Sequence, residues 1–320
     1  MAAASDEPSV PVIDLTAFRL GQDAAAAAAV AREWDAAMRT LGMCIIVGHG
    51  CPASLTEGLY RAARDFFTMT DEEKMRSCLH RGYGAGGYVP PGVEAVARSV
   101  SGDSESKPDL VENIVFSHGG VGEVVMPASP AELQPSVVEY WKQMNAMLLL
   151  LMRLSARALS LPDEHFDASF EAPKCNLRLA HYPPLAALPR EQVDGATRYG
   201  AHTDYTGFTI LRPDPAAGGL EAQTRGGEWI GVPPVRDGLV VNAGDLIQVW
   251  TNDRWRSPPH RVVNPRDPTL GRTSLVFFTG PEDSTVVEAL PGTTDADHPP
   301  LYEPVTAGVH LRNKLQRSNV

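Results

Sequence analysis

The sequence is poor in cysteine and in positive charge. It has 4 cysteines in 320 residues and no C-x-x-C pair, so neither a disulfide framework nor a cysteine-rich zinc site is indicated. Its 28 Lys and Arg stand against 39 Asp and Glu, a net charge of -11, which leaves no basic stripe for nucleic acid. We therefore expect free thiols and no nucleic-acid partner.

Long hydrophobic runs and a secretory start are also absent. The apolar run "AMLLLLM", 146–152, is far too short to span a bilayer, and Arg153 follows it at once. The first residues, "MAAASDEPSVPVIDL", have neither a basic start nor an apolar core of a signal peptide. These features predict a cytoplasmic protein without a membrane partner.

The N-terminal half, residues 1–173, has helical periodicity. Helices are predicted over 22–42, 54–69 and 136–161, each with apolar residues at helical spacing. Residues about 80–130 are rich in Gly, Pro and Ser and predict loops that cover a substrate. We expect this half to pack as a helical region on the rest of the chain.

The C-terminal half, residues 174–320, changes to short strands separated by turn residues. "TRGGEW" is typical of a hairpin, with Gly226 and Gly227 at the turn. Many short strands at close spacing predict a sandwich or a jelly roll. The fold class expected is therefore a mainly β core with a helical N-terminal half.

Three residues of the β half predict a metal site. In "YGAHTDYTGF", His202 and Asp204 are two apart, so an extended strand directs both to the same face. His260 follows 56 positions after Asp204, and a closed β architecture can bring it beside them. Two His and one carboxylate with open positions favour a non-haem Fe(II) oxygenase. Zinc accepts the same ligands, but its single open tetrahedral position suits hydrolysis.

A second pair predicts an anion site. Arg272 and Ser274, in "GRTSLVFF", are again two apart and share one strand face. A guanidinium beside a hydroxyl is a good carboxylate receptor, and a buried Arg on a core strand needs an anion. A dicarboxylic cosubstrate would supply that anion and chelate the metal with its other end.

These motifs identify a family resemblance. "GAHTDYTGFTIL", "VVNAGDLIQVWTNDRWRSPPHRVVNP" and "RTSLVFF", with the N-terminal "VPVIDL", "GHG" and "RDFFTMTDEEK", resemble the Fe(II)/2-oxoglutarate-dependent dioxygenases of the isopenicillin N synthase-like family. The resemblance implies a double-stranded β-helix, a jelly-roll variant. It also implies roles for individual residues: Fe(II) ligands His202, Asp204 and His260, and 2-oxoglutarate contacts Arg272, Ser274 and Tyr182.

The reaction implied is O2-dependent oxidation of a C–H bond in a small organic molecule, with release of succinate and CO2. Hydroxylation, desaturation and ring closure all remain open as outcomes. Expected substrate contacts are Tyr83, Phe116 and Phe278. Two alternatives also stay open: an iron oxidase of the isopenicillin N synthase type that uses no 2-oxoglutarate, and a non-catalytic small-molecule binding protein on the same fold.

Overall fold

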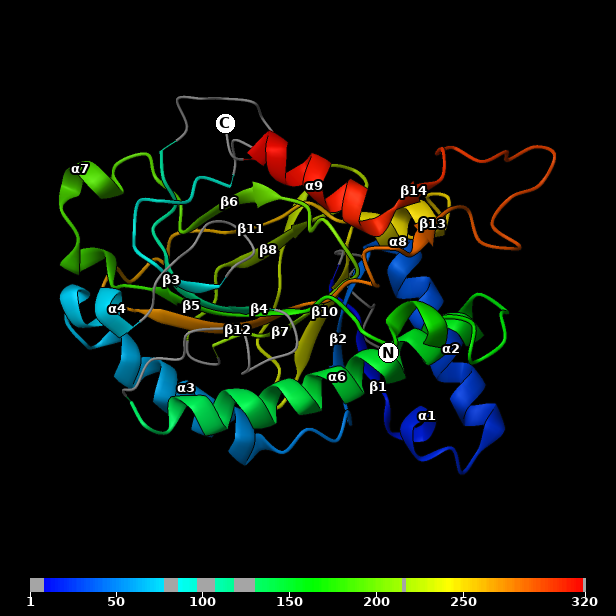
Figure 1. Cartoon of the computed structure of the whole chain (residues 1–320), viewed down its shortest axis with the longest axis horizontal. Helices are drawn as coiled ribbons and strands as arrows, with labels where there is room; N and C mark the ends of the chain where they lie inside the picture. The colour runs from blue at the N-terminus through cyan, green and yellow to red at the C-terminus, as the bar shows by residue number, and fades with distance from the viewer. Residues whose placement is uncertain (1–8, 78–85, 97–106, 118–129, 215–216, 319–320) are drawn as a thin grey trace, which may run out of the picture.

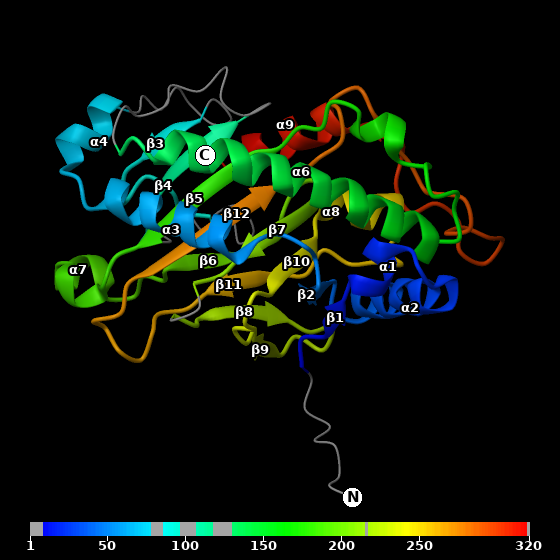
Figure 2. The same ribbon diagram turned by 90° about the horizontal axis from the view of Figure 1, so that it is seen from below.

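The computed structural model describes residues 9–77, 86–96, 107–117, 130–214 and 217–318. Two β-sheets face each other at its centre, and helices cover the outer face of the larger sheet (Figures 1 and 2). No helix in these ranges is long and apolar enough to cross a membrane.

The larger sheet has eight strands in the order β1-β2-β10-β7-β12-β5-β4-β3. It is antiparallel except for the parallel pair β1–β2. Four of its strands come from the N-terminal half, so that half extends the sheet as well as covering it. Its strands are β1 (Val12–Asp14), β2 (Met43–Val47), β3 (Gly87–Val89), β4 (Glu112–Ser117), β5 (Asn176–Tyr182), β7 (Phe208–Arg212), β10 (Leu239–Ala243) and β12 (Arg272–Phe278).

The smaller sheet has four strands in the order β6-β11-β8-β9. They are β6 (Tyr199–His202), β8 (Leu220–Gln223), β9 (Trp229–Gly231) and β11 (His260–Val262). One apolar cluster contains Tyr182 and Val240 of the larger sheet and Leu220 and Val262 of the smaller one, so the two sheets pack face to face. This arrangement agrees with the jelly-roll prediction. A third, two-stranded sheet pairs β13 (Val286–Val287) with β14 (Val305–Thr306).

The predicted N-terminal helices are present. α2 (Ala24–Thr40), α3 (Ala53–Phe67) and α6 (Leu133–Ala158) correspond to the three helical segments expected. α6 runs along the larger sheet in both views, beside α3 (Figures 1 and 2). The Trp34 indole of α2 donates to Ser155 Oγ of α6 at 3.1 Å, which joins these helices inside the core.

Shorter helices complete the described chain. α1 (Thr16–Leu20) and α4 (Asp71–Ser77) flank the N-terminal strands. The 3-10 turns η1 (Asp167–Phe170) and η2 (Leu185–Ala187) lie on either side of β5, followed by α7 (Arg190–Val193) and α8 (Asp245–Trp250). α9 (Ala307–Ser318) is a C-terminal helix that the sequence patterns did not identify. In the view of Figure 1 it lies on the opposite side of the β core from α6.

The prediction of loops over residues 80–130 is corrected in part. β3 and β4 lie in this stretch and form one edge of the larger sheet. Gly86 and Gly87 have φ of 80° and 109°, a conformation that favours glycine, so the strand begins in a sequence that has the composition of a loop. β4 pairs with β5, which fixes the direction of every side chain between Glu112 and Ser117.

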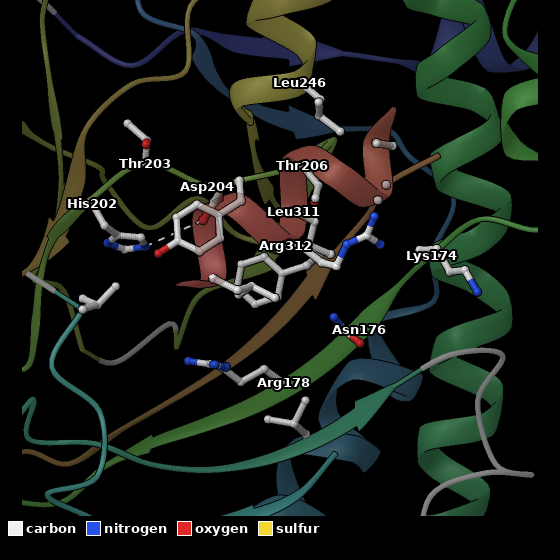
Figure 3. A pocket seen from close by; sticks show the side chains of 18 of the residues that line it. Lys174, Asn176, Arg178, His202, Thr203, Asp204, Thr206, Leu246, Leu311 and Arg312 are labelled. Atoms are coloured by element: carbon white, nitrogen blue, oxygen red, sulfur yellow. Dashed lines mark ion pairs between the residues drawn. The ribbon is translucent and has the colours of Figure 1, made fainter. Parts of the chain in front are cut away.

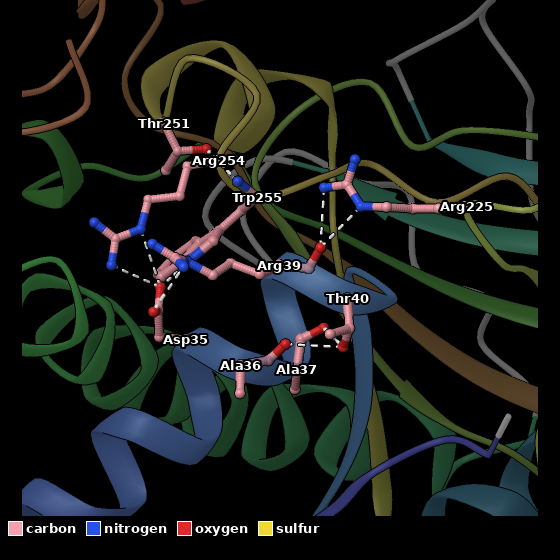
Figure 4. Close-up of polar contacts among 9 residues, drawn as sticks. All are labelled: Asp35, Ala36, Ala37, Arg39, Thr40, Arg225, Thr251, Arg254 and Trp255. Carbon is pink, nitrogen blue, oxygen red and sulfur yellow. Dashed lines mark hydrogen bonds and ion pairs between the residues drawn. The ribbon is translucent and has the colours of Figure 1, made fainter. Parts of the chain in front are cut away.

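The helical layer also holds the segment that leads into β11. Asp35 of α2 accepts hydrogen bonds from the Trp255 indole at 2.8 Å and from Arg254 at 3.0 Å (Figure 4). One turn further on, the Arg39 carbonyl oxygen accepts two hydrogen bonds from Arg225, at 3.0 and 2.9 Å (Figure 4). The chain just before His260 is therefore fixed from outside the β core.

Candidate active site

His202, Asp204 and His260 meet at the open end of the space between the sheets. β6 and β11 pair with His260 directly opposite His202, and their ring centroids are 4.2 Å apart. Asp204 follows β6 by two residues, and its Oδ1 lies 3.7 Å from the Nε2 atom of each histidine. All three side chains are buried, with at most 9% of any residue exposed. The sequence prediction that these residues come together agrees with this geometry.

Backbone carbonyl groups orient both histidines. Nδ1 of His202 donates to the Gly200 carbonyl oxygen at 2.9 Å, and Nδ1 of His260 donates to that of Pro258 at 3.1 Å. A proton on Nδ1 leaves Nε2 with its lone pair, and both Nε2 atoms lie toward Asp204. The two carbonyl groups thus fix the direction in which each ring presents its Nε2 atom.

Asp204 is held by two partners that sequence reasoning did not find. Thr209 Oγ1 donates to Asp204 Oδ2 at 2.5 Å, and Asn242 Nδ2 donates to the same oxygen at 2.6 Å. Oδ1 remains as the oxygen that lies beside the histidines. The sequence pattern around Asn242 predicts a turn. The residue lies instead in β10, where it is buried and pairs in register with Thr209 of β7.

Burial and mutual charge set the protonation of this cluster. Burial and the neighbouring His260 lower the pKa of His202 to about 3, so its ring is neutral at physiological pH. Burial raises the pKa of Asp204, but the two histidines and the hydrogen bonds from Thr209 and Asn242 outweigh this effect and bring it below the usual value. The result is a carboxylate at Asp204 beside a neutral imidazole at His202, the protonation states in which these two groups bind a divalent cation.

The donor set fits an iron ion. One ligand atom from each of the three residues lies within 4.8 Å of the others. Asp204 Oδ1 lies 3.7 Å from each histidine Nε2, a separation that one ion with bonds of about 2.0–2.2 Å can bridge. Nitrogen and oxygen donors on one side of a buried point are the arrangement of non-haem Fe(II) oxygenases. The remaining side of that point faces a cavity.

Arg272 and Ser274 lie in that same cavity. Both are buried on β12, and Arg272 Nε donates to Ser274 Oγ at 3.0 Å. Arg272 Nη1 donates to the Gly218 carbonyl oxygen at 2.7 Å. Within the described residues these hydrogen bonds all go to neutral acceptors, and Asp214 acts on the guanidinium through its charge without a hydrogen bond to it. An anion in the cavity would supply a charged acceptor.

Two further side chains surround this guanidinium. Tyr182 is the β5 partner of Arg272 in register, and its ring centroid lies 5.7 Å from the Arg272 guanidinium carbon. The guanidinium carbon of Arg198, a fully buried residue, lies 6.0 Å from the same ring centroid. Burial and the nearby Arg272 lower the pKa of Arg198 to about 10. This second cation, which sequence reasoning missed, adds to the positive potential at this end of the cavity.

A larger pocket of about 340 Å³ opens from the His202–Asp204 end of the site (Figure 3). A pocket of this size accommodates a small organic molecule. Its walls come from the larger sheet, the segment after β6 and helix α9. The residues that line it include Val115, Asn176, Arg178, Thr206, Leu246, Phe278, Leu311 and Arg312.

The three expected substrate contacts have different positions. Phe278 lines both this pocket and the inner cavity, next to Asn176 of β5 in register. Phe116 is buried in the core beneath the helices, so the expectation that it contacts substrate is corrected. Strand alternation in β4 places Val115 in the pocket wall instead. Tyr83 lies outside the described residues.

Comparison with known proteins decides the family. Residues 173–281 match the 2OG-Fe(II) oxygenase superfamily, and residues 10–122 match the family described as non-haem dioxygenase in morphine synthesis N-terminal. Gibberellin 20 oxidase 1-D of Triticum aestivum is 33% identical over 320 residues, which cover 95% of this chain and 81% of the relative. The chain belongs to the 2-oxoglutarate- and Fe(II)-dependent oxygenases.

Relatives of this family extend beyond plants. Validamycin A dioxygenase of Streptomyces hygroscopicus subsp. limoneus is 30% identical over 302 residues, covering 88% of this chain and 80% of the relative. Among solved structures, a full-length Neurospora crassa protein in complex with alpha-KG and thymine has a TM-score of 0.86 at 28% identity, and the match covers 99% of each chain.

Family membership confirms several predictions together. The double-stranded β-helix fold is confirmed, and the chain is a dioxygenase that uses Fe(II), 2-oxoglutarate and O2 to oxidise a small organic molecule. The 2-oxoglutarate-dependent reaction is supported over the alternative iron oxidase, because the named relatives include 2-oxoglutarate-dependent dioxygenases. The inner cavity therefore has to be considered as the place where Fe(II) and 2-oxoglutarate bind.

Proposed function

We propose that His202, Asp204 and His260 bind the Fe(II) ion of this dioxygenase. The observation that carries the assignment is the shared direction of three buried donor atoms, the two Nε2 atoms and Asp204 Oδ1. The bound iron supplies the activation of O2. The Nδ1 hydrogen bonds to backbone carbonyl groups fix the orientation of both imidazoles, and Thr209 and Asn242 keep the carboxylate turned toward them.

We propose that Arg272, Ser274 and Tyr182 bind 2-oxoglutarate. Arg272 would grip the distal carboxylate with two parallel N–H donors, and the Ser274 hydroxyl, already bonded to Arg272 Nε, orients that fork. Both residues line the same cavity as the iron ligands, so one dicarboxylate can reach both ends. Burial of the guanidinium, whose pKa burial lowers, strengthens its attraction for an anion.

We propose that the substrate occupies the pocket of Figure 3, with Phe278 as a contact at its junction with the inner cavity. This placement directs one C–H bond of a small molecule toward the open side of the iron. The names and titles of the relatives compared above refer to gibberellin, validamycin A and thymine, which supports a small organic molecule as the substrate class.

We also propose that residues 174–320 form the catalytic core and residues 1–173 a region that supports it. All six residues of the two cofactor sites lie in the first of these segments. The supporting role rests on the contacts of α2 with the chain just before His260.

Anaerobic titration of the apo-protein tests both cofactor assignments. Addition of Fe(II) and then 2-oxoglutarate is expected to produce the weak visible charge-transfer band of a chelated 2-oxo acid. The band should be absent with His202→Ala and should need far more 2-oxoglutarate with Arg272→Ala. A normal band in both variants would contradict the assignments.

A further inference from the structure

We propose that Glu94 makes the inner end of the substrate pocket selective for uncharged groups by neutralising Arg178, the cation of that end. The proposal rests on the proposed function, because it takes the pocket of Figure 3 as the substrate site. Arg178 lines both this pocket and the inner cavity that contains the iron ligands, so it lies where the two meet. A buried arginine in this position would by itself recruit a carboxylate.

Glu94 occupies that carboxylate position. Arg178 Nη2 donates to Glu94 Oε1 at 3.0 Å, and Nη1 donates to Glu94 Oε2 at 3.1 Å, a two-pronged contact between the planar groups. The side chains of Arg178 and Glu94 are only 11% and 19% exposed. The pair is therefore shielded from water, and a mobile surface contact would not have this geometry.

Glu94 is fixed by more than the arginine. Asn113, fully buried in β4, donates from Nδ2 to Glu94 Oε2 at 3.0 Å. The backbone carbonyl oxygen of Glu94 accepts from Asp109 N at 2.8 Å, and Asp109 Oδ1 accepts from Gly200 N at 2.9 Å. The carboxylate is thus built into the wall from two sides, which makes its displacement by a ligand costly.

The arginine is also joined to the iron site. Arg178 Nη1 donates to the Tyr199 hydroxyl at 2.9 Å, and the Tyr199 ring packs edge-on against His202 with centroids 5.0 Å apart. The Phe278 ring centroid lies 5.8 Å from the guanidinium carbon of Arg178. A ring-bearing substrate beside Phe278 would therefore meet the Arg178–Glu94 pair close to the oxidised position.

The pair favours one kind of ligand and opposes another. A ligand carboxylate would lie beside Glu94 and meet like charge, which is a common way to exclude a wrong ligand. An amide, or a heterocycle with adjacent donor and acceptor groups, matches this wall, because Arg178 provides donors and Glu94 provides acceptors.

Matched probes differing only in charge test the proposal. The full-length protein, loaded anaerobically with Fe(II) and saturating 2-oxoglutarate, is titrated by calorimetry with nicotinamide and nicotinate, and with benzamide and benzoate. The wild-type protein is expected to bind each amide more tightly than its carboxylate. In Glu94→Gln, which keeps the side-chain shape, carboxylate affinity should rise by about tenfold to a hundredfold, the range for a charge-assisted contact.

Two comparison variants isolate the cause. Asp283→Asn removes the same charge from the pocket wall but leaves the Glu94 carboxylate on Arg178 in place, so it should give only a small change. The double variant with Glu94→Gln and Arg178→Gln should lose the gain. Glu94→Ala serves as a second release of Arg178 if Glu94→Gln folds poorly.

Several outcomes would overturn the proposal. They are a wild-type preference for the carboxylates, a carboxylate affinity in the Glu94 variants that is unchanged or undetectable, and an equal gain in Asp283→Asn. Failure of the proposed function is distinguished separately, because it would abolish the visible band of wild type with 2-oxoglutarate before any probe is added.

Discussion

The two faces of the larger sheet have different roles although they share the same strands. On β12, Ser274 and Phe278 face the cavity, whereas Leu275 and Phe277 are fully buried beneath the helices. On β5, Arg178 faces the cavity, and its neighbours Leu177 and Leu179 join the helix-side core. Because successive side chains of a strand point to opposite faces, the residues that contact the cavity are separated from those that stabilise the core. Substitutions on one face should change function, and those on the other should change folding.

The largest effect is expected at the iron end of the cavity face. Asp204→Ala removes the only carboxylate of the cluster and should abolish turnover, because two imidazoles alone hold iron weakly. The checks are succinate release and iron content after anaerobic gel filtration. Retained iron with full turnover would contradict the ligand assignment.

The helix face provides the opposite case. Phe277→Ala should lower the free energy of unfolding by about 3–5 kcal/mol, because a fully buried ring that packs edge-on against Trp141 is lost. The folded fraction should keep the KM values of wild type. Urea unfolding and steady-state kinetics test this; a changed KM without loss of stability would break the separation of the two faces.

The cosubstrate end should show an intermediate effect. Arg272→Ala is expected to weaken 2-oxoglutarate binding by about tenfold to a hundredfold, through loss of a charge-assisted contact. Arg272→Lys should restore part of the affinity, since it keeps the charge but not the planar fork. Both affinities can be measured by titration of the visible band. If substrate binding weakened instead and 2-oxoglutarate binding did not, the arginine would serve the substrate.

The smallest effect is expected at the residues that hydrogen-bond to the iron ligand Asp204. Asn242→Ala removes one of two donors to Asp204 Oδ2 and should lower iron affinity by about tenfold, with little change in the KM for 2-oxoglutarate. Thr209→Val removes the other donor and should act in the same direction. Competition with a chelator gives the affinities. An unchanged iron affinity in both variants would mean that the orientation of the Asp204 carboxylate does not depend on these two hydrogen bonds.

Strand alternation explains why sequence reasoning reached the central residues. Arg272 and Ser274 are two apart within β12, and the structure places both on its cavity face. Asp204 lies two residues beyond the end of β6 and still meets His202 in the same cavity. Phe116 shows the limit of this reasoning. Its stretch has the composition of a loop, so alternation gives no prediction there, and only pairing of β4 with β5 fixes its direction.

Hydrogen-bond partners that are distant in the chain could not be predicted from the sequence, for another reason. Asn242 is 38 residues from Asp204, and Glu94 is 84 residues from Arg178. Alternation gives the face of each residue but not which strand lies beside it. Contacts of this kind follow from the order of strands in the sheet, which local patterns leave undetermined.

One consequence follows from helix α9. Its residues Leu311 and Leu315 form part of the pocket wall, and Lys314 Nζ pairs with Asp245 of α8 at 2.6 Å. This part of the wall comes from α9 alone, which is distant in sequence from the iron and cosubstrate residues. Chimeric enzymes can therefore be made by exchanging α9 between relatives. Such an exchange would change the outer part of the pocket and leave the strands that carry the iron and cosubstrate residues unaltered.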